Sequence, residues 1–124
     1  MLLRGTPHAK PHLWLVLTEP DGDPAETVAV MVRSRKAYTD DTVVLAPGDH
    51  PFIHRASSVH YSTARRLRVD RILRRIRSGQ CHLKEDLEAD LLARVREGLM
   101  TSPFTVNAVR EYCRNRFPAG GRCP

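Results

Sequence analysis

The sequence contains little that would build a secreted, disulfide-bonded or membrane-spanning protein. Only three of its 124 residues are cysteine, and no two of them are spaced as Cys-x-x-Cys. A disulfide framework or a zinc site of paired cysteines is therefore not expected. No apolar run approaches the roughly 20 residues that cross a bilayer, and Pro7 and His8 interrupt the start, unlike a secretory signal. We expect a soluble protein that is located in the cytoplasm and has no membrane partner.

Several catalytic motifs are absent from the sequence as well. It has no Gly-x-x-x-x-Gly-Lys-Ser/Thr loop for nucleoside triphosphates, no Gly-x-Gly-x-x-Gly turn for dinucleotides and no Gly-x-Ser-x-Gly elbow. No pair of carboxylates has the spacing of a general acid and base. These absences argue against triphosphate hydrolysis, dinucleotide binding and esterase chemistry.

The positive charge of the protein is concentrated in one arginine-rich segment. The formal net charge is +6, and residues 65–77 alone carry seven arginines and one aspartate. Residues 1–64 are nearly neutral, with six basic and seven acidic side chains. This balance indicates a polyanionic partner. A solvated basic face that binds nothing specific is the alternative.

The first half of the sequence has the pattern of a β-sheet. Short apolar or Val- and Thr-rich runs alternate with turns such as Pro47-Gly48-Asp49. The expected strands are residues 12–18, 26–32, 41–45, 50–54 and 58–61. Strands of this length and spacing favour a small barrel or a strongly bent antiparallel sheet.

The second half of the sequence changes to the helical period. Val69, Ile72, Leu73 and Ile76 are spaced as one face of a helix. Leucine or valine recurs every fourth residue from Leu83 to Leu99, which predicts a second helix. Ser102-Pro103 predicts the N-cap and first residue of a third helix.

These patterns predict an α+β protein, with two to three helices after the sheet. We expect one domain over residues 1–117, with a β-rich part at 10–62 and a helical part at 64–117. Residues 118–124 are expected to form a flexible tail.

Histidines gather in the β-rich half and form a candidate catalytic group. Five of the six lie in this half or in the segment leading to it: His8, His12, His50, His54 and His60. Histidine titrates near neutral pH and can transfer protons. The alternatives are a structural role for each histidine and a metal site formed by Asp49, His50, His54 and His60. No His-x-His or His-Glu-x-x-His spacing supports the metal site.

Two further features bear on nucleic-acid binding. Arg33-Ser34-Arg35-Lys36 follows an expected strand, where a hydroxyl between cations can contact a phosphate oxygen; a plain polar turn is the alternative. Phe52 and Tyr61 are candidates for stacking on bases, with burial as the alternative. Trp14, the only tryptophan, is expected in the core.

Residues 10–17 and 28–34 carry a resemblance to a known family. Lys10-Pro11 and the apolar run after it resemble the Arg-Pro-apolar strand near the start of MazF/PemK-like toxins, and residues 28–34 resemble their next strand and turn. The similarity covers about residues 10–99 through short motifs. The sequence departs from the family in having Lys10 in place of arginine, in lacking the opening strand and in its additional turn at residues 47–52.

The resemblance implies an SH3-like barrel with appended helices, commonly a homodimer. It also implies cleavage of single-stranded RNA without a metal or cofactor, and an antitoxin protein that covers the site. Lys10 would then neutralise the scissile phosphate, His12 or His54 would act as general base, and Ser34 would hold a phosphate oxygen. The expected nucleic-acid contacts are His8, Arg33, Arg35, Arg71, Arg74 and Arg75.

The expected function is therefore that of a toxin-like endoribonuclease. Its main alternative is a non-catalytic module of the same fold that binds nucleic acid or an acidic protein. A weaker alternative is a metal-dependent hydrolase.

Overall fold

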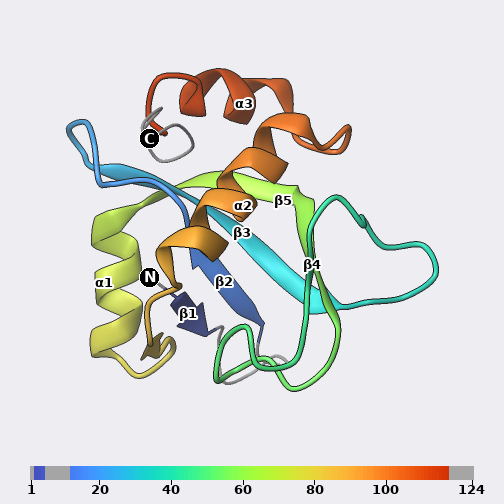
Figure 1. Cartoon of the computed structure of the whole chain (residues 1–124). Helices are drawn as coiled ribbons and strands as arrows, with labels where there is room; N and C mark the ends of the chain where they lie inside the picture. Colours follow the sequence, from blue (N-terminus) through green and yellow to red (C-terminus); the bar gives the residue numbers. More distant parts are fainter. Residues whose placement is uncertain (1, 5–11, 118–124) are drawn as a thin grey trace.

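The computed structural model describes residues 2–4 and 12–117, and its strands form one antiparallel sheet (Figure 1). The strands are β1 (Leu2–Arg4), β2 (Leu13–Val16), β3 (Glu26–Ser34), β4 (Val44–Leu45), β5 (Ser57–Arg68) and β6 (Leu83–Lys84). Their spatial order is β4-β5-β3-β2-β1-β6. The predicted α+β class and antiparallel sheet are confirmed. The edge strands β4 and β6 do not pair with each other within the described residues, so the sheet is open and not a closed barrel.

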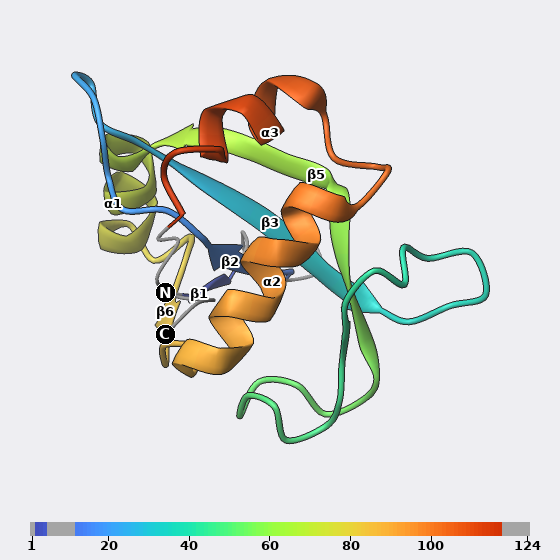
Figure 2. The ribbon, with the colours of Figure 1, turned by 45° about the horizontal axis from the view of Figure 1, so that its top comes forward.

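Three helices follow the long strand β5: α1 (Val69–Arg77), α2 (Ala89–Thr101) and α3 (Asn107–Cys113). Helix α2 lies across one face of the sheet, and α3 lies beyond it along β5 (Figure 2). The side chains of Leu91, Val95 and Leu99 point from α2 into the hydrophobic core. Within the described residues no helix lies across the opposite face in this way, and Arg33 and Arg65 on that face are exposed. No helix in the described part of the chain is long and apolar enough to span a membrane.

Tyr61 and Gly98 set how closely α2 approaches the sheet. Tyr61 of β5 is fully buried, and its hydroxyl donates a hydrogen bond to the carbonyl oxygen of Val95 at 2.7 Å. Burial raises the pKa of this hydroxyl, so it stays a donor. A methyl group on Gly98 would collide with the Tyr61 ring and hydroxyl and with Val43. The glycine is therefore required by packing. Of the two roles left open for Tyr61, burial is confirmed and stacking on bases is excluded, because the side chain is fully buried.

A β-bulge in β5 decides which of its side chains share a face. Ala29 and Met31 of β3 are two residues apart, but their partners in β5, Arg65 and His60, are five apart. In a regular strand, positions that differ by an odd number point to opposite faces. The extra residues of the bulge therefore bring His60 and Arg65 to the same face. The Thr63 hydroxyl oxygen accepts the Met31 N–H at 3.0 Å and so satisfies a backbone group that the bulge would leave without a partner.

The arginine-rich segment is part strand and part helix. Arg65, Arg66 and Arg68 end β5, and the chain continues without a loop into α1 (Figure 1). The predicted helix at 69–76 and its end at Ser78-Gly79 are confirmed. No residue of α1 is fully buried, and Leu73 is 44% exposed, so its apolar stripe is only partly covered.

Three predicted elements are wrong in position or type. Residues 50–54 form a turn and not a strand, because the Nδ1 atom of His50 accepts the backbone N–H of Phe52 at 3.0 Å. The helix expected over residues 83–99 begins only at Ala89, since Leu83 pairs with β1 in the short strand β6. Ser102 caps the turn before α3 and not α3 itself: its hydroxyl oxygen accepts the Phe104 N–H at 3.1 Å.

We predict that Gly98→Ala destabilises the protein by about 1–3 kcal/mol, the usual cost of overpacking a core. The added methyl group would push Tyr61 or α2 away and weaken the Tyr61–Val95 hydrogen bond. Urea unfolding of the two proteins measures the effect. The exposed neighbour Glu97→Ala is the control and is expected to change the free energy of unfolding by less than about 0.5 kcal/mol. Equal stability of the two variants would contradict the packing role of Gly98.

Candidate functional site

One cleft of about 620 Å³ brings together polar side chains from the ends of several strands. Its walls include His12 before β2, Ser34 at the end of β3, His54 in the turn before β5 and His60 within β5. Cationic side chains also line it: Arg33, Lys36 and Arg55. Neighbouring strands end at the same edge of the sheet, and the cleft brings together His12 and His60, which are 48 positions apart in the sequence.

Some of the predicted site residues meet in this cleft and others do not. His12, Arg33, Ser34 and His54 line it together. Arg35 does not line it, because its guanidinium faces Asp41. The predicted contacts on α1 are also outside the cleft lining: Arg71, Arg74 and Arg75. His8 and Lys10 lie outside the described residues.

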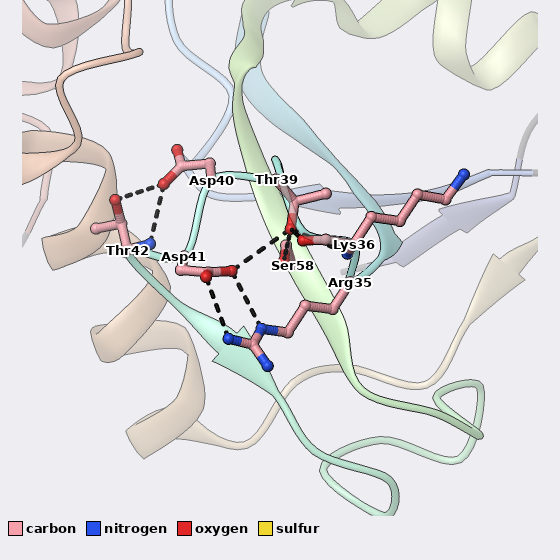
Figure 3. A network of polar contacts seen from close by, with 7 residues as sticks. All are labelled: Arg35, Lys36, Thr39, Asp40, Asp41, Thr42 and Ser58. Carbon is pink, nitrogen blue, oxygen red and sulfur yellow. Dashed lines mark hydrogen bonds and ion pairs between the residues drawn. The ribbon is translucent and has the colours of Figure 1, made fainter.

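The loop between β3 and β4 forms one wall of the cleft and is held by a network of polar contacts (Figure 3). Arg35 donates two hydrogen bonds to the Asp41 carboxylate, both at 3.2 Å, and the Thr39 hydroxyl donates to the Lys36 carbonyl oxygen at 2.8 Å. The Ser58 hydroxyl donates to Thr39 at 3.1 Å and ties the loop to β5. Arg35 thus stabilises the loop that forms the wall of the cleft. Lys36, in the same turn, lines the cleft.

Asp40 anchors this loop to the helical layer. Its carboxylate is buried and accepts the Ser102 hydroxyl at 2.7 Å, and it also accepts the N–H and hydroxyl of Thr42 at 2.9 and 2.6 Å. A buried carboxylate is tolerated only when donors surround it in this way. The contact with Ser102 joins residues 62 positions apart, so the cleft wall depends on where α2 ends.

His60 is the cleft residue with the most distinctive electrostatic environment. Partial burial and the positive charge of Arg33 lower its pKa below the ordinary 6.5, and Asp40 opposes them weakly. Its Nδ1 atom lies 3.4 Å from Arg33 Nη1. Because a guanidinium can only donate, Nδ1 is the acceptor and the proton of the neutral ring is on Nε2. His60 is therefore neutral at neutral pH, as a general base must be.

Sequence reasoning missed two aromatic residues at the cleft. Tyr38 is 85% exposed and Phe104 is 56% exposed, and both line the cleft, with the half-buried Phe52 nearby. Exposed aromatic rings beside cations are typical of surfaces that stack nucleic-acid bases. Their loops have no periodic pattern, although Tyr38 is only two residues beyond Lys36, the last residue of the cationic turn 33–36.

The alternative metal site is not assembled. His50 is buried, and its Nε2 atom lies 2.8 Å from the carbonyl oxygen of Glu85, so both ring nitrogens are engaged by the backbone. Within residues 2–4 and 12–117, no three His, Cys, Asp or Glu side chains gather closely enough to hold a metal ion. His50 thus has a structural role, whereas His12, His54 and His60 face the cleft.

No family model, curated protein or solved structure matches this chain. The resemblance to MazF/PemK-like toxins therefore stays a prediction.

We predict that Arg33→Gln raises the pKa of His60, because removal of the adjacent positive charge favours the imidazolium. Burial is the larger cause and persists in the variant, so the pKa stays below 6.5. The chemical shifts of the imidazole protons, followed against pH by NMR, measure the change. Arg55→Gln also removes a cation from the cleft lining and is the matched control; an equal rise in both variants would contradict a specific effect of Arg33.

The lowered pKa also predicts how stability depends on pH. The unfolded chain binds a proton at His60 near pH 6.5, whereas the folded chain binds it only at lower pH. The contribution of His60 to stability is thus lost as pH falls from about 6.5 to the lowered pKa, and is constant above this window. Urea midpoints compared for the wild type and His60→Gln across pH 5–8 test this sign.

Proposed function

We propose that this protein is a metal-independent endoribonuclease that cleaves single-stranded RNA in the cleft. The observation that carries the proposal is the convergence of three histidines with Ser34 and several cations in one hollow. Metal-independent cleavage of RNA needs a base, an acid and positive charge around one phosphate, and the cleft supplies all three kinds of group. The aromatic rings of Tyr38 and Phe104 suit the unpaired bases of a single strand.

In this reaction the 2′-hydroxyl of the RNA loses its proton to a histidine and its oxygen attacks the adjacent phosphorus. The bond from phosphorus to the 5′-oxygen breaks, and a second histidine gives its proton to that oxygen. The products are a 2′,3′-cyclic phosphate and a 5′-hydroxyl. No oxidant, metal or cofactor is needed for the balance of atoms and charge.

We assign the base to His60 and the acid to His54 or His12. His60 is neutral in the free protein, and its contact with Arg33 is long at 3.4 Å. A phosphate offers Arg33 a charged, bidentate acceptor, which is a stronger partner than an imidazole nitrogen. Movement of Arg33 to the phosphate would free Nδ1 of His60 for the 2′-hydroxyl proton. This assignment replaces the expected choice of His12 or His54 as base.

Ser34 and Lys36 support the same step. A hydroxyl beside cations at the end of β3 can donate to a non-bridging oxygen, and Lys36 and Arg55 add positive charge as the phosphorus becomes pentacovalent. The family resemblance also implies an antitoxin partner and a homodimeric state. The geometry of the cleft does not bear on these two predictions.

We predict that His60→Ala, and separately the double variant His12→Ala/His54→Ala, each slow RNA cleavage by about 10²–10⁴-fold, the usual contribution of a positioned proton-transfer group. The assay is cleavage of a single-stranded RNA oligonucleotide in the presence of EDTA, with the product ends identified by mass. The wild-type rate should fall with acid only below pH 6.5, because the pKa of His60 is lowered.

His82→Ala is the matched control, since His82 is exposed and does not line the cleft. It should cleave like the wild type. A wild type that cleaves no RNA, or histidine variants of the cleft that cleave as fast as His82→Ala, would contradict the proposal. Binding of RNA without cleavage would instead support the non-catalytic module.

A further inference from the structure

A second hollow, of about 420 Å³, lies between the end of β5, β2 and α1. We call it the Trp14 groove. It is lined by the only tryptophan of the protein and by five arginines: Arg65, Arg66, Arg68, Arg71 and Arg75. Trp14 is half-buried and not part of the core, which corrects the expectation for this residue. The cleft, by comparison, is lined by two arginines and one lysine.

Part of the cleft and part of the groove lie on the same face of the sheet. His12 and Trp14 flank one residue of the extended chain at β2, so their side chains point the same way about 7 Å apart along it. On β5 the bulge brings His60 of the cleft and Arg65 of the groove to one face. A chain bound in the cleft can therefore continue into the groove without crossing an edge of the sheet.

Two of the arginines are neutralised by protein carboxylates. Arg66 pairs with Glu26 at 2.5 Å, and Arg68 pairs with Asp70 at 2.7 Å. Arg65 lies instead over the Trp14 ring, with its guanidinium carbon 5.0 Å from the ring centre.

Arg71 and Arg75 are one helical turn apart on α1, and neither has an ion pair within the described residues. The groove thus presents at least three cations that no carboxylate of the described chain offsets. Such an arrangement calls for an anionic ligand from outside.

The chemistry of the groove favours nucleic acid over an acidic peptide. Guanidinium groups bind phosphate oxygens in pairs, and both an indole ring and a guanidinium plane stack on bases. An acidic peptide would satisfy the arginines but would offer no flat ring to the Arg65–Trp14 stack. A single strand of RNA satisfies both kinds of group.

We propose that the Trp14 groove is a second subsite, which binds the stretch of single-stranded RNA adjacent to the phosphate held in the cleft. The identity of this strand rests on the proposed function. Within the subsite, Arg71 and Arg75 hold phosphates of the backbone, and the Arg65–Trp14 stack receives a base. Arg74, expected to contact nucleic acid together with these two, does not line the groove and has no part in it.

The test uses the fluorescence of Trp14, which is specific for the groove because the protein has no other tryptophan. The full chain is titrated with a non-cleavable 2′-O-methyl RNA of about 12 nucleotides, within the range of known single-strand sites. We expect saturable quenching. In Arg71→Gln/Arg75→Gln, the slope of log Kd against log salt concentration should be smaller than in the wild type by about 1.4. This is about 0.7 for each of the two phosphate contacts that the variant loses.

Arg74→Gln/Arg77→Gln is the matched control, with the same charge removed from the same helix but outside the groove lining. We expect the Arg71/Arg75 variant to bind at least about tenfold more weakly at low salt and the control to stay within about threefold, because only direct phosphate contacts are lost in full. Equal weakening in both variants, or no quenching in the wild type, would overturn the subsite. Tighter binding of a polyglutamate peptide than of the RNA would overturn it in favour of an acidic protein partner.

A dinucleotide substrate separates this proposal from the proposed function. It is too short to fill both hollows, so the wild type and Arg71→Gln/Arg75→Gln should cleave it equally, while the longer RNA is cleaved less efficiently by the variant through a raised KM. If the variant cleaves the longer RNA with the same KM as the wild type, the subsite is overturned and the proposed function is not. Quenching with the expected arginine dependence, but without cleavage of any RNA, would leave the groove as a nucleic-acid site and contradict only the catalytic proposal.

Discussion

The departure of β5 from the register of β3 is the constraint on which the rest of the structure depends. Without the bulge, Arg65 would point to the face opposite His60 and so into the layer that α2 covers. A guanidinium there would be buried without a carboxylate partner, at a high cost in desolvation. The bulge instead turns both Tyr61 and Ala64 inward, where they pack in the core, and leaves His60 and Arg65 on the open face. One local irregularity thus serves the core, the cleft and the groove together.

The parts of this arrangement that sequence could predict are those fixed by local periodicity. The Val-rich run of β3 and the apolar spacing of α1 follow from their own residues. The turn at residues 50–54 could not be predicted, because it depends on the distant Glu85 carbonyl that orients His50. Leu83 continues a helical spacing but joins a strand, since β1 offers it a pairing edge. The positions of His12, Ser34 and His54 at strand ends were enough to predict that they lie together. The shared face of His60 and Arg65 could not be predicted, because it depends on a bulge that has no clear sequence signal.

The net charge favours a polyanionic partner, which stays a prediction, and it does not indicate which arginines would bind such a partner. The arginines of residues 65–77 are divided among three tasks that the sequence does not distinguish. Arg66 and Arg68 are bound to carboxylates, Arg65 covers an aromatic ring, and α1 carries the others. Arginines elsewhere are structural as well: Arg110 donates to the carbonyl oxygens of Met100 and Ser102 and so caps the end of α2. Among the cations of this segment, Arg65 lies on the same face of the sheet as His60, and the unpaired arginines are carried by α1.

Under the proposed function, binding of a phosphate beside Arg33 would change the pKa of His60, the proposed base. In the free protein the charge of Arg33 holds the pKa of His60 low, which keeps the ring neutral but makes it a weak base. A phosphate beside Arg33 would offset the positive charge that lowers the pKa of His60. The pKa of His60 would then rise toward about 7 when the RNA with its 2′-hydroxyl is bound. If the proposed function holds, Arg33 would keep His60 unprotonated in the empty cleft and would release its Nδ1 atom when a phosphate binds.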